Sequence, residues 1–201
     1  PRTTLFRCRQ RQMCIRDRVL TKTPICNFGE NPHSFSLKGV DEKIYKLEDC
    51  LGKNGTIIMF ICNHCPYVKA IIRNIVEDTN KLKELNIKAV AIMSNDTINY
   101  PEDSFEKMKE FSKLNNFNFP YVIDTSQEIA KKYGAVCTPD FFGYNGNQEL
   151  QYRGRMRELK ELRPVNSGDS DLYKAMKQIS ETGKGPDNQI PSMGCNIKWF
   201  N

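Results

Sequence analysis

Runs of hydrophobic residues predict most of the elements of this chain. Residues 35–37 and 44–47 are short strand-like runs on either side of a polar turn at residues 41–42, and they predict a small hairpin. Thr56 to Cys62 is a continuous β-branched and aromatic run, the pattern of a strand buried on both faces. From Pro66 to Leu85 the hydrophobic residues instead recur at helical spacing. We therefore expect an amphipathic helix directly after a central strand.

The next segments continue this alternation of strands and helices. Residues 87–93 form a second buried-type run, so residues 56–93 are predicted as strand, helix, strand with parallel pairing. Pro101 opens a further helix, whose buried face we assign to Phe105, Met108, Phe111 and Leu114. Residues 121–123 follow as a short strand. The pattern is that of an α/β fold.

The last part of the chain predicts an antiparallel end to the sheet. A brief helix over residues 127–133 stops at Gly134, and residues 141–144 and 149–152 flank the hairpin signal Asn145-Gly146. Leu172, Ala175, Met176 and Ile179 mark a final amphipathic helix that stops at Gly183. The predicted fold is a central mixed sheet flanked by helices. We assign residues 34–182 to one domain, residues 19–33 to an irregular lead-in, and residues 183–201 to a C-terminal tail.

Composition excludes two classes of partner. The chain has 201 residues, and its longest apolar run is far shorter than the roughly 20 residues of a membrane span. The net charge of +6 invites a nucleic-acid function, but six of the 30 basic residues and one acid lie in residues 1–18. The remainder holds 24 basic and 23 acidic residues, a net charge of +1. We expect neither a membrane nor a nucleic acid as partner.

The arginine-rich start of the chain needs a separate interpretation. Residues 13–18, Met-Cys-Ile-Arg-Asp-Arg, resemble a translated adapter sequence from DNA library preparation. We interpret residues 1–18 as a non-native leader, with a genuine basic tail as the alternative, and leave them out of the fold. No secretory signal core precedes the domain, which favours a bacterial cytoplasmic protein.

One cysteine pair has a spacing that indicates chemistry. Of the eight cysteines, Cys62 and Cys65 form a Cys-Asn-His-Cys motif where the predicted central strand turns into a helix. Helix N-terminal amides stabilise a thiolate, so we expect Cys62 to be an exposed nucleophile with a lowered pKa. His64 can add a stabilising donor or charge. Cys65, one helical turn inward, is then placed to resolve a mixed disulfide.

The motif and a later segment resemble the thioredoxin-like superfamily over about residues 34–182. Lys132-Tyr133-Gly134, followed five residues later by Pro139, is similar to the stretch that leads into the cis-proline loop of thioredoxins. The resemblance implies that Thr138-Pro139 is this loop, facing the cysteines. Residues 60–67 and 191–195 resemble a bacterial peroxiredoxin-like or redoxin-domain subgroup. This implies a thiol-disulfide oxidoreductase without a cofactor, acting on protein or small-molecule disulfides or thiols with an unidentified thiol electron donor.

Two other functions remain open. A peroxiredoxin-like thiol peroxidase could use the same cysteines, although neither Cys62 nor Cys65 follows the Pro-x-x-x-Thr/Ser-x-x-Cys pattern of that chemistry. A redox-inactive interaction module could hold a metal, with Cys137 and His64 as the extra ligands, but our assignment includes no metal. Cys137 and Cys195 are additional redox candidates, with simple packing as the alternative for each. The oligomeric state does not follow from the sequence.

Overall fold

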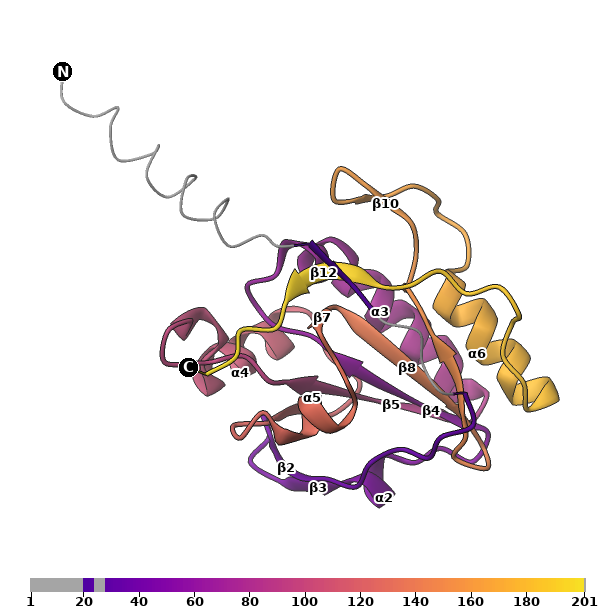
Figure 1. The fold of residues 1–201 in the computed structure, drawn as a ribbon, viewed down its shortest axis with the longest axis horizontal. Helices are drawn as coiled ribbons and strands as arrows, with labels where there is room; N and C mark the ends of the chain where they lie inside the picture. Colours follow the sequence, from indigo (N-terminus) through magenta and orange to yellow (C-terminus); the bar gives the residue numbers. More distant parts are fainter. Residues whose placement is uncertain (1–19, 24–27, 201) are drawn as a thin grey trace.

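A seven-stranded mixed sheet forms the centre of the computed structural model, which describes residues 20–23 and 28–200 (Figure 1). The strand order is β3-β2-β6-β5-β4-β8-β9. The strands are β2 (Ser36–Gly39), β3 (Ile44–Lys46), β4 (Gly55–Phe60), β5 (Ile87–Met93), β6 (Tyr121–Ile123), β8 (Asp140–Asn145) and β9 (Leu150–Arg153). The predicted α/β fold with a mixed sheet is confirmed.

β4 is the strand that places the cysteine motif. It pairs in parallel with β5, from Gly55 opposite Ile87 to Phe60 opposite Ile92, and antiparallel with β8 on its other side. All six of its residues are buried, as a continuous apolar run predicts. The connection from β4 to β5 is α3 (Pro66–Glu84), so the motif lies between the end of β4 and the start of this helix.

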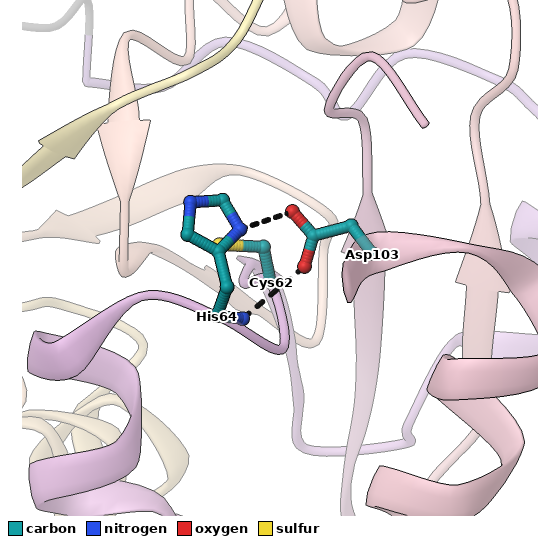
Figure 2. Close-up of side chains that lie close together, drawn as sticks. All are labelled: Cys62, His64 and Asp103. Carbon is teal, nitrogen blue, oxygen red and sulfur yellow. Dashed lines mark hydrogen bonds and ion pairs between the residues drawn. The ribbon is translucent and has the colours of Figure 1, made fainter. Parts of the chain in front are cut away.

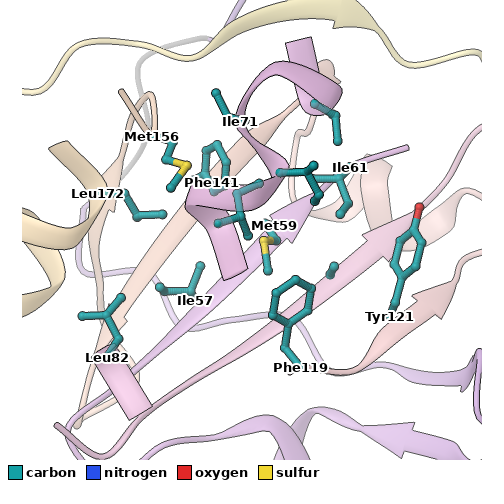
Figure 3. Close-up of a cluster of buried hydrophobic side chains, with 14 of the residues drawn as sticks. Ile57, Met59, Ile61, Ile71, Leu82, Phe119, Tyr121, Phe141, Met156 and Leu172 are labelled. Carbon is teal, nitrogen blue, oxygen red and sulfur yellow. The ribbon is translucent and has the colours of Figure 1, made fainter. Parts of the chain in front are cut away.

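Helices cover both faces of the sheet. Side chains of β4 alternate between the faces, with Ile57 and Met59 in one hydrophobic cluster and Ile58 and Phe60 in the other. The first cluster, part of which is drawn in Figure 3, is closed by α3, α4 and α6, and the second by α2 and α5. The helical segments are α2 (Leu47–Cys50), α3, the 3-10 turn η1 (Pro101–Asp103), α4 (Phe105–Leu114), α5 (Glu128–Lys132) and α6 (Asp171–Thr182). None of the described helices has the length and apolar character of a membrane span.

A second, three-stranded sheet was not predicted. β1 (Leu20–Lys22) lies in the predicted irregular lead-in, β12 (Met193–Asn196) lies in the predicted tail, and both pair antiparallel in the order β1-β12-β7. The third strand, β7 (Cys137–Thr138), precedes Pro139. The predictions for these two segments were wrong because three or four residues without alternation carry no strand signal, and only their distant partners make them strands. β10 (Leu159–Lys160) and β11 (Arg163–Pro164) form a further small pair.

Smaller differences concern element ends. The helix predicted from Pro101 is divided into η1 and α4 at Ser104, and Leu114, assigned to its buried face, is 80% exposed. The hairpin of β8 and β9 is confirmed, with a four-residue loop between the strands. Gly183 ends α6 at a φ of 74°, in the left-handed region that favours glycine. The leader assigned to residues 1–18, with Cys8 and Cys14, lies outside the described residues, as does Cys26.

Candidate redox site

The two motif cysteines lie at the junction of β4 and α3. Cys65 is the N-cap of α3 and Pro66 is its first residue, where a missing N–H removes no helical hydrogen bond. The side chains of Cys62 and Cys65 are 1% and 0% exposed, and both belong to the hydrophobic cluster beneath α3. The expectation that Cys62 is exposed is therefore wrong in this conformation.

The loop at Thr138-Pro139 faces both cysteines. The Oγ1 atom of Thr138 lies 3.4 Å from Sγ of Cys62, and its carbonyl oxygen lies 3.1 Å from Sγ of Cys65. The Thr138–Pro139 peptide bond is cis. Both the isomer and the position implied by the resemblance to thioredoxins are thus confirmed, and one residue bridges the pair.

The pKa values of the pair shift in the opposite directions to our expectation. Burial raises the pKa of Cys62, and its hydrogen bond with Cys65 raises it further. Burial acts in the same direction on Cys65, but hydrogen bonds from the thiols of Cys195 and Cys62 and from the Val68 amide lower the pKa of Cys65 below its ordinary value. The N-cap position, which is that of Cys65, is where a helix stabilises negative charge. The pKa shifts therefore favour negative charge on Cys65 over Cys62.

His64 and Asp103 form an ion pair beside Cys62 (Figure 2). Nδ1 of His64 lies 2.6 Å from Oδ2 of Asp103, and the imidazole stacks on Tyr100 with the ring centroids 5.7 Å apart. Burial lowers the pKa of His64, but the hydrogen bond and the charge of Asp103 outweigh it, and the net shift is upward. A ligand nitrogen of the ring and Sγ of Cys62 lie within 4.8 Å of each other. A protonated His64 therefore favours thiolate character at Cys62.

Asp103 was missed by the sequence analysis. It is fully buried, and its Oδ1 accepts from the amides of Asn63 (2.8 Å) and His64 (3.2 Å). Its Oδ2 also accepts from Nδ2 of Asn95 (2.8 Å), in addition to His64. The sequence indicated only an acid in a first helical turn, and no spacing linked Asp103 to a motif almost 40 residues away. Two of its four hydrogen bonds thus hold the backbone between the two cysteines, and the other two hold the side chains of His64 and Asn95.

These contacts also bear on metal binding. Cys62, His64 and Asp103 offer three ligand atoms within 4.8 Å of one another. Each carboxylate oxygen has two lone pairs, and the four hydrogen bonds of Asp103 occupy all of them. The group brought together contains Asp103 with Cys62 and His64, and not the Cys137 considered from the sequence. The arrangement fits an organised thiol site better than a metal centre.

The remaining cysteines fall into two groups. Burial raises the pKa of Cys137, and its side chain is fully enclosed at the start of β7. Cys50 is buried in α2, in the cluster on the opposite face of the sheet. Cys195 lies on β12, 6% exposed, in the same cluster as Cys62 and Cys65. Among the cysteines that the structure describes, Cys195 is the one that shares the cluster of the motif pair.

Comparison with known proteins identifies relatives of the chain. A model of the AhpC/TSA family matches residues 28–157. An uncharacterized conserved protein from Geobacillus kaustophilus is 37% identical, with a TM-score of 0.83 over 90% of this chain and 96% of that one. A hypothetical protein from Sinorhizobium meliloti 1021 is 32% identical, with a TM-score of 0.83 over 90% and 98%. No curated protein matches the chain.

A more distant structure shares the fold alone. The thioredoxin domain of a thiol-disulfide oxidoreductase from Bacteroides vulgatus is 13% identical, with a TM-score of 0.60 over 78% of this chain and 99% of that domain. This likeness agrees with the mixed sheet and its covering helices. The fold is thioredoxin-like.

Proposed function

Because this chain belongs to the AhpC/TSA family and has a thioredoxin-like fold, we propose that it is a thiol-disulfide oxidoreductase with Cys62 and Cys65 as its redox pair. The observation that carries the proposal is the contact between the two sulfurs against Thr138. Two thiols in hydrogen-bond contact can close to a disulfide and release two electrons. The proposed substrate is a protein or small-molecule disulfide, and an external dithiol restores the pair.

The first step in this proposal is attack by Cys62. Its sulfur lies within 4.8 Å of a ring nitrogen of His64, whose side chain is 23% exposed and carries the positive charge that favours a thiolate at Cys62. As Cys62 attacks one sulfur of the substrate disulfide, its proton passes to Cys65, to which it is already hydrogen bonded. A mixed disulfide forms on Cys62, and the other half of the substrate leaves as a thiolate.

The second step closes the internal disulfide. The proton on Cys65 passes to the departing thiolate, and the regenerated Cys65 thiolate attacks Sγ of Cys62. The Cys62–Cys65 bond forms, the mixed disulfide breaks, and the second half of the substrate leaves. Asp103 and His64 act as positioning groups in this scheme because they hold the motif backbone and place positive charge near Cys62.

Trapping the mixed disulfide tests the scheme. Full-length Cys65→Ser, treated with oxidised glutathione or a peptide disulfide, is expected to hold a covalent adduct on Cys62, because the resolving thiol of the scheme is absent. Mass spectrometry would locate the adduct on the tryptic peptide of residues 54–69. Cys62→Ser is expected to hold no substrate adduct, and Cys50→Ser should behave like the unmodified chain. Trapping in Cys62→Ser alone would reverse the order of attack, and the absence of adducts and of turnover would reject the function.

A thiol peroxidase is the second candidate. The Thr138 hydroxyl, 3.4 Å from Sγ of Cys62, favours it because a hydroxyl beside a reactive thiol can hold a peroxide oxygen. However, the chain lacks the motif that supplies this hydroxyl in peroxiredoxins. Stopped-flow measurement of peroxide reduction separates the two functions. Fast, saturable peroxide consumption with little disulfide exchange would favour the peroxidase.

A further inference from the structure

The C-terminal strand brings a third thiol into the redox site. Cys195 is paired with Thr138, the residue that contacts both motif cysteines. The carbonyl oxygen of Thr138 lies 3.1 Å from Sγ of Cys65, and Cys62, Cys65 and Cys195 belong to one hydrophobic cluster. Strand pairing therefore places the Cys195 thiol beside the motif cysteines. Neither the spacing of Cys62 and Cys65 nor the scheme above requires a third thiol at this place.

Several contacts hold β12 in this position. The amide of Ile197 donates to the carbonyl oxygen of Val136 at 3.1 Å, and the Ser192 hydroxyl donates to the carbonyl oxygen of Gly154 at 2.8 Å. Beyond β12, the amide of Lys198 donates to Oδ1 of Asn95 at 2.9 Å. Asn95 also donates to Asp103, so the same network reaches the motif. Residues before and after Cys195 in the chain are thus hydrogen bonded to other parts of the protein.

The backbones approach closely next to Cys195. A Cβ atom added to Gly194 would lie 2.1 Å from the carbonyl oxygen of Thr138. Only glycine allows β12 to lie this near to the loop of Pro139. This close backbone contact keeps Cys195 near Cys65.

We propose that Cys195 is a third redox thiol, which takes over the disulfide from Cys62 by exchange at Cys65. This inference rests on the proposed thiol-disulfide function. The thiolate of Cys195 attacks Sγ of Cys65 in the Cys62–Cys65 disulfide. The Cys65–Cys195 bond forms, the Cys62–Cys65 bond breaks, and Cys62 leaves as a thiolate that takes the proton lost by Cys195. No net oxidation or reduction occurs in this step.

The exchange changes what the site can do next. It returns Cys62 to the thiol state, so that Cys62 can attack a second disulfide while the first oxidising equivalent is stored between Cys65 and Cys195. It also ties β12 covalently to the start of α3. The substrate class is the disulfide of the proposed function, and an external dithiol would discharge the stored disulfide.

Disulfide mapping in full-length variants tests the proposal. Trypsin places Cys62 and Cys65 together in residues 54–69 and Cys195 in residues 185–198. After oxidation of folded Cys62→Ser with diamide, we expect these two peptides to be joined as the main disulfide product. In oxidised Cys195→Ser we expect an internal Cys62–Cys65 disulfide instead. The unmodified chain and the control Cys50→Ser should give both products.

The outcomes separate this inference from the proposed function. If Cys195→Ser forms its internal disulfide and turns over substrate as the unmodified chain does, while Cys62→Ser joins no peptides, Cys195 has no redox role. Joining of residues 185–198 to any other cysteine would also overturn the proposal. If Cys195→Ser forms no disulfide and neither it nor the unmodified chain exchanges disulfides, the proposed function itself fails. Oxidation after unfolding in urea is the control for random pairing.

Discussion

A single buried carboxylate organises the residues around the cysteines. Asp103 accepts the two motif amides through one oxygen and the His64 and Asn95 side chains through the other. A buried amide that loses its acceptor costs about 1–3 kcal/mol. The carboxylate also explains the raised pKa of His64, since burial alone would lower it. One residue thus sets both the geometry of the motif and the charge beside Cys62.

Replacing Asp103 by asparagine should separate these two effects. Asp103→Asn keeps the size of the side chain and an oxygen that can accept from the motif amides, but it removes the negative charge. We expect the pKa of His64 to fall, because burial is then opposed only by the smaller effects of Cys65 and Glu102. NMR titration of the imidazole measures this, and His64→Gln assigns the signal among the two histidines of the chain. An unchanged pKa would show that Asp103 does not control the charge of His64.

The sequence predicted those site residues whose spacing is itself the signal. Cys62, Cys65 and Thr138-Pro139 could be found because a two-residue spacing and a tyrosine-glycine-proline pattern are local features. Asp103 could not be found, because its link to the motif is a set of hydrogen bonds across about 40 residues of chain. The lowered pKa of Cys65 was not predicted for a similar reason, because it depends on Cys195, whose position is set by strand pairing.

Elements with long periodic patterns were also predicted well. β4, α3 and β5 follow from about 40 residues of clear hydrophobic pattern, and α6 follows from four apolar residues at helical spacing. β1 and β12 have no such pattern. Their stability comes from backbone pairing with each other and with β7. Short strands of this kind become visible only when their partners are known.

The close contact between β12 and Thr138, beside the two motif cysteines, gives a prediction for Gly194. Gly194→Ala places a methyl group against the Thr138 carbonyl oxygen and the ring of Pro139, so β12 must shift away from β7. We expect alkylation of Cys62 and Cys65 by iodoacetamide to become about tenfold faster, which corresponds to a local opening easier by about 1.4 kcal/mol. The mass of the peptide of residues 54–69 reports the reaction.

Gly168→Ala is the matched control for this experiment. A Cβ atom at Gly168 meets nothing within 4 Å, so this variant should react like the unmodified chain. Equal rates in both alanine variants would mean that β12 does not limit access to the cysteines.

At the scale of the whole molecule, a buried ion pair joins β9, at the edge of the sheet, to the residue that follows Thr138-Pro139. Asp140 follows Pro139 directly, and its Oδ2 accepts from Nη2 of Arg153 on β9 at 3.1 Å. The same nitrogen donates to the carbonyl oxygen of Gly134, which precedes β7. Burial raises the pKa of Asp140 from 3.8 to about 7, because the charge of Arg153 offsets only part of the lost hydration. The folded protein therefore keeps a proton that the unfolded chain has lost.

This proton makes the stability of the whole chain depend on pH. Between pH 3.8 and about 7 the folded state binds one proton more than the unfolded state at Asp140, so the free energy of unfolding falls as pH rises. The raised pKa of His64 acts in the same direction, because its contribution is lost as pH rises through that pKa. From pH 5 to pH 7 we expect Asp140 alone to contribute a loss on the order of 3 kcal/mol at most, at about 1.4 kcal/mol per pH unit.

Urea unfolding at several pH values between 5 and 8, with the thiols kept reduced, measures this loss. The stability of Asp140→Asn should depend much less on pH, because its amide is neutral in both the folded and the unfolded state. Asp169→Asn removes an exposed carboxylate and should keep the original slope. A slope that is equal in all three proteins would mean that Asp140 is already charged at pH 5. The Asp140–Arg153 pair beside Thr138-Pro139 would then keep both of its charges across the whole pH range.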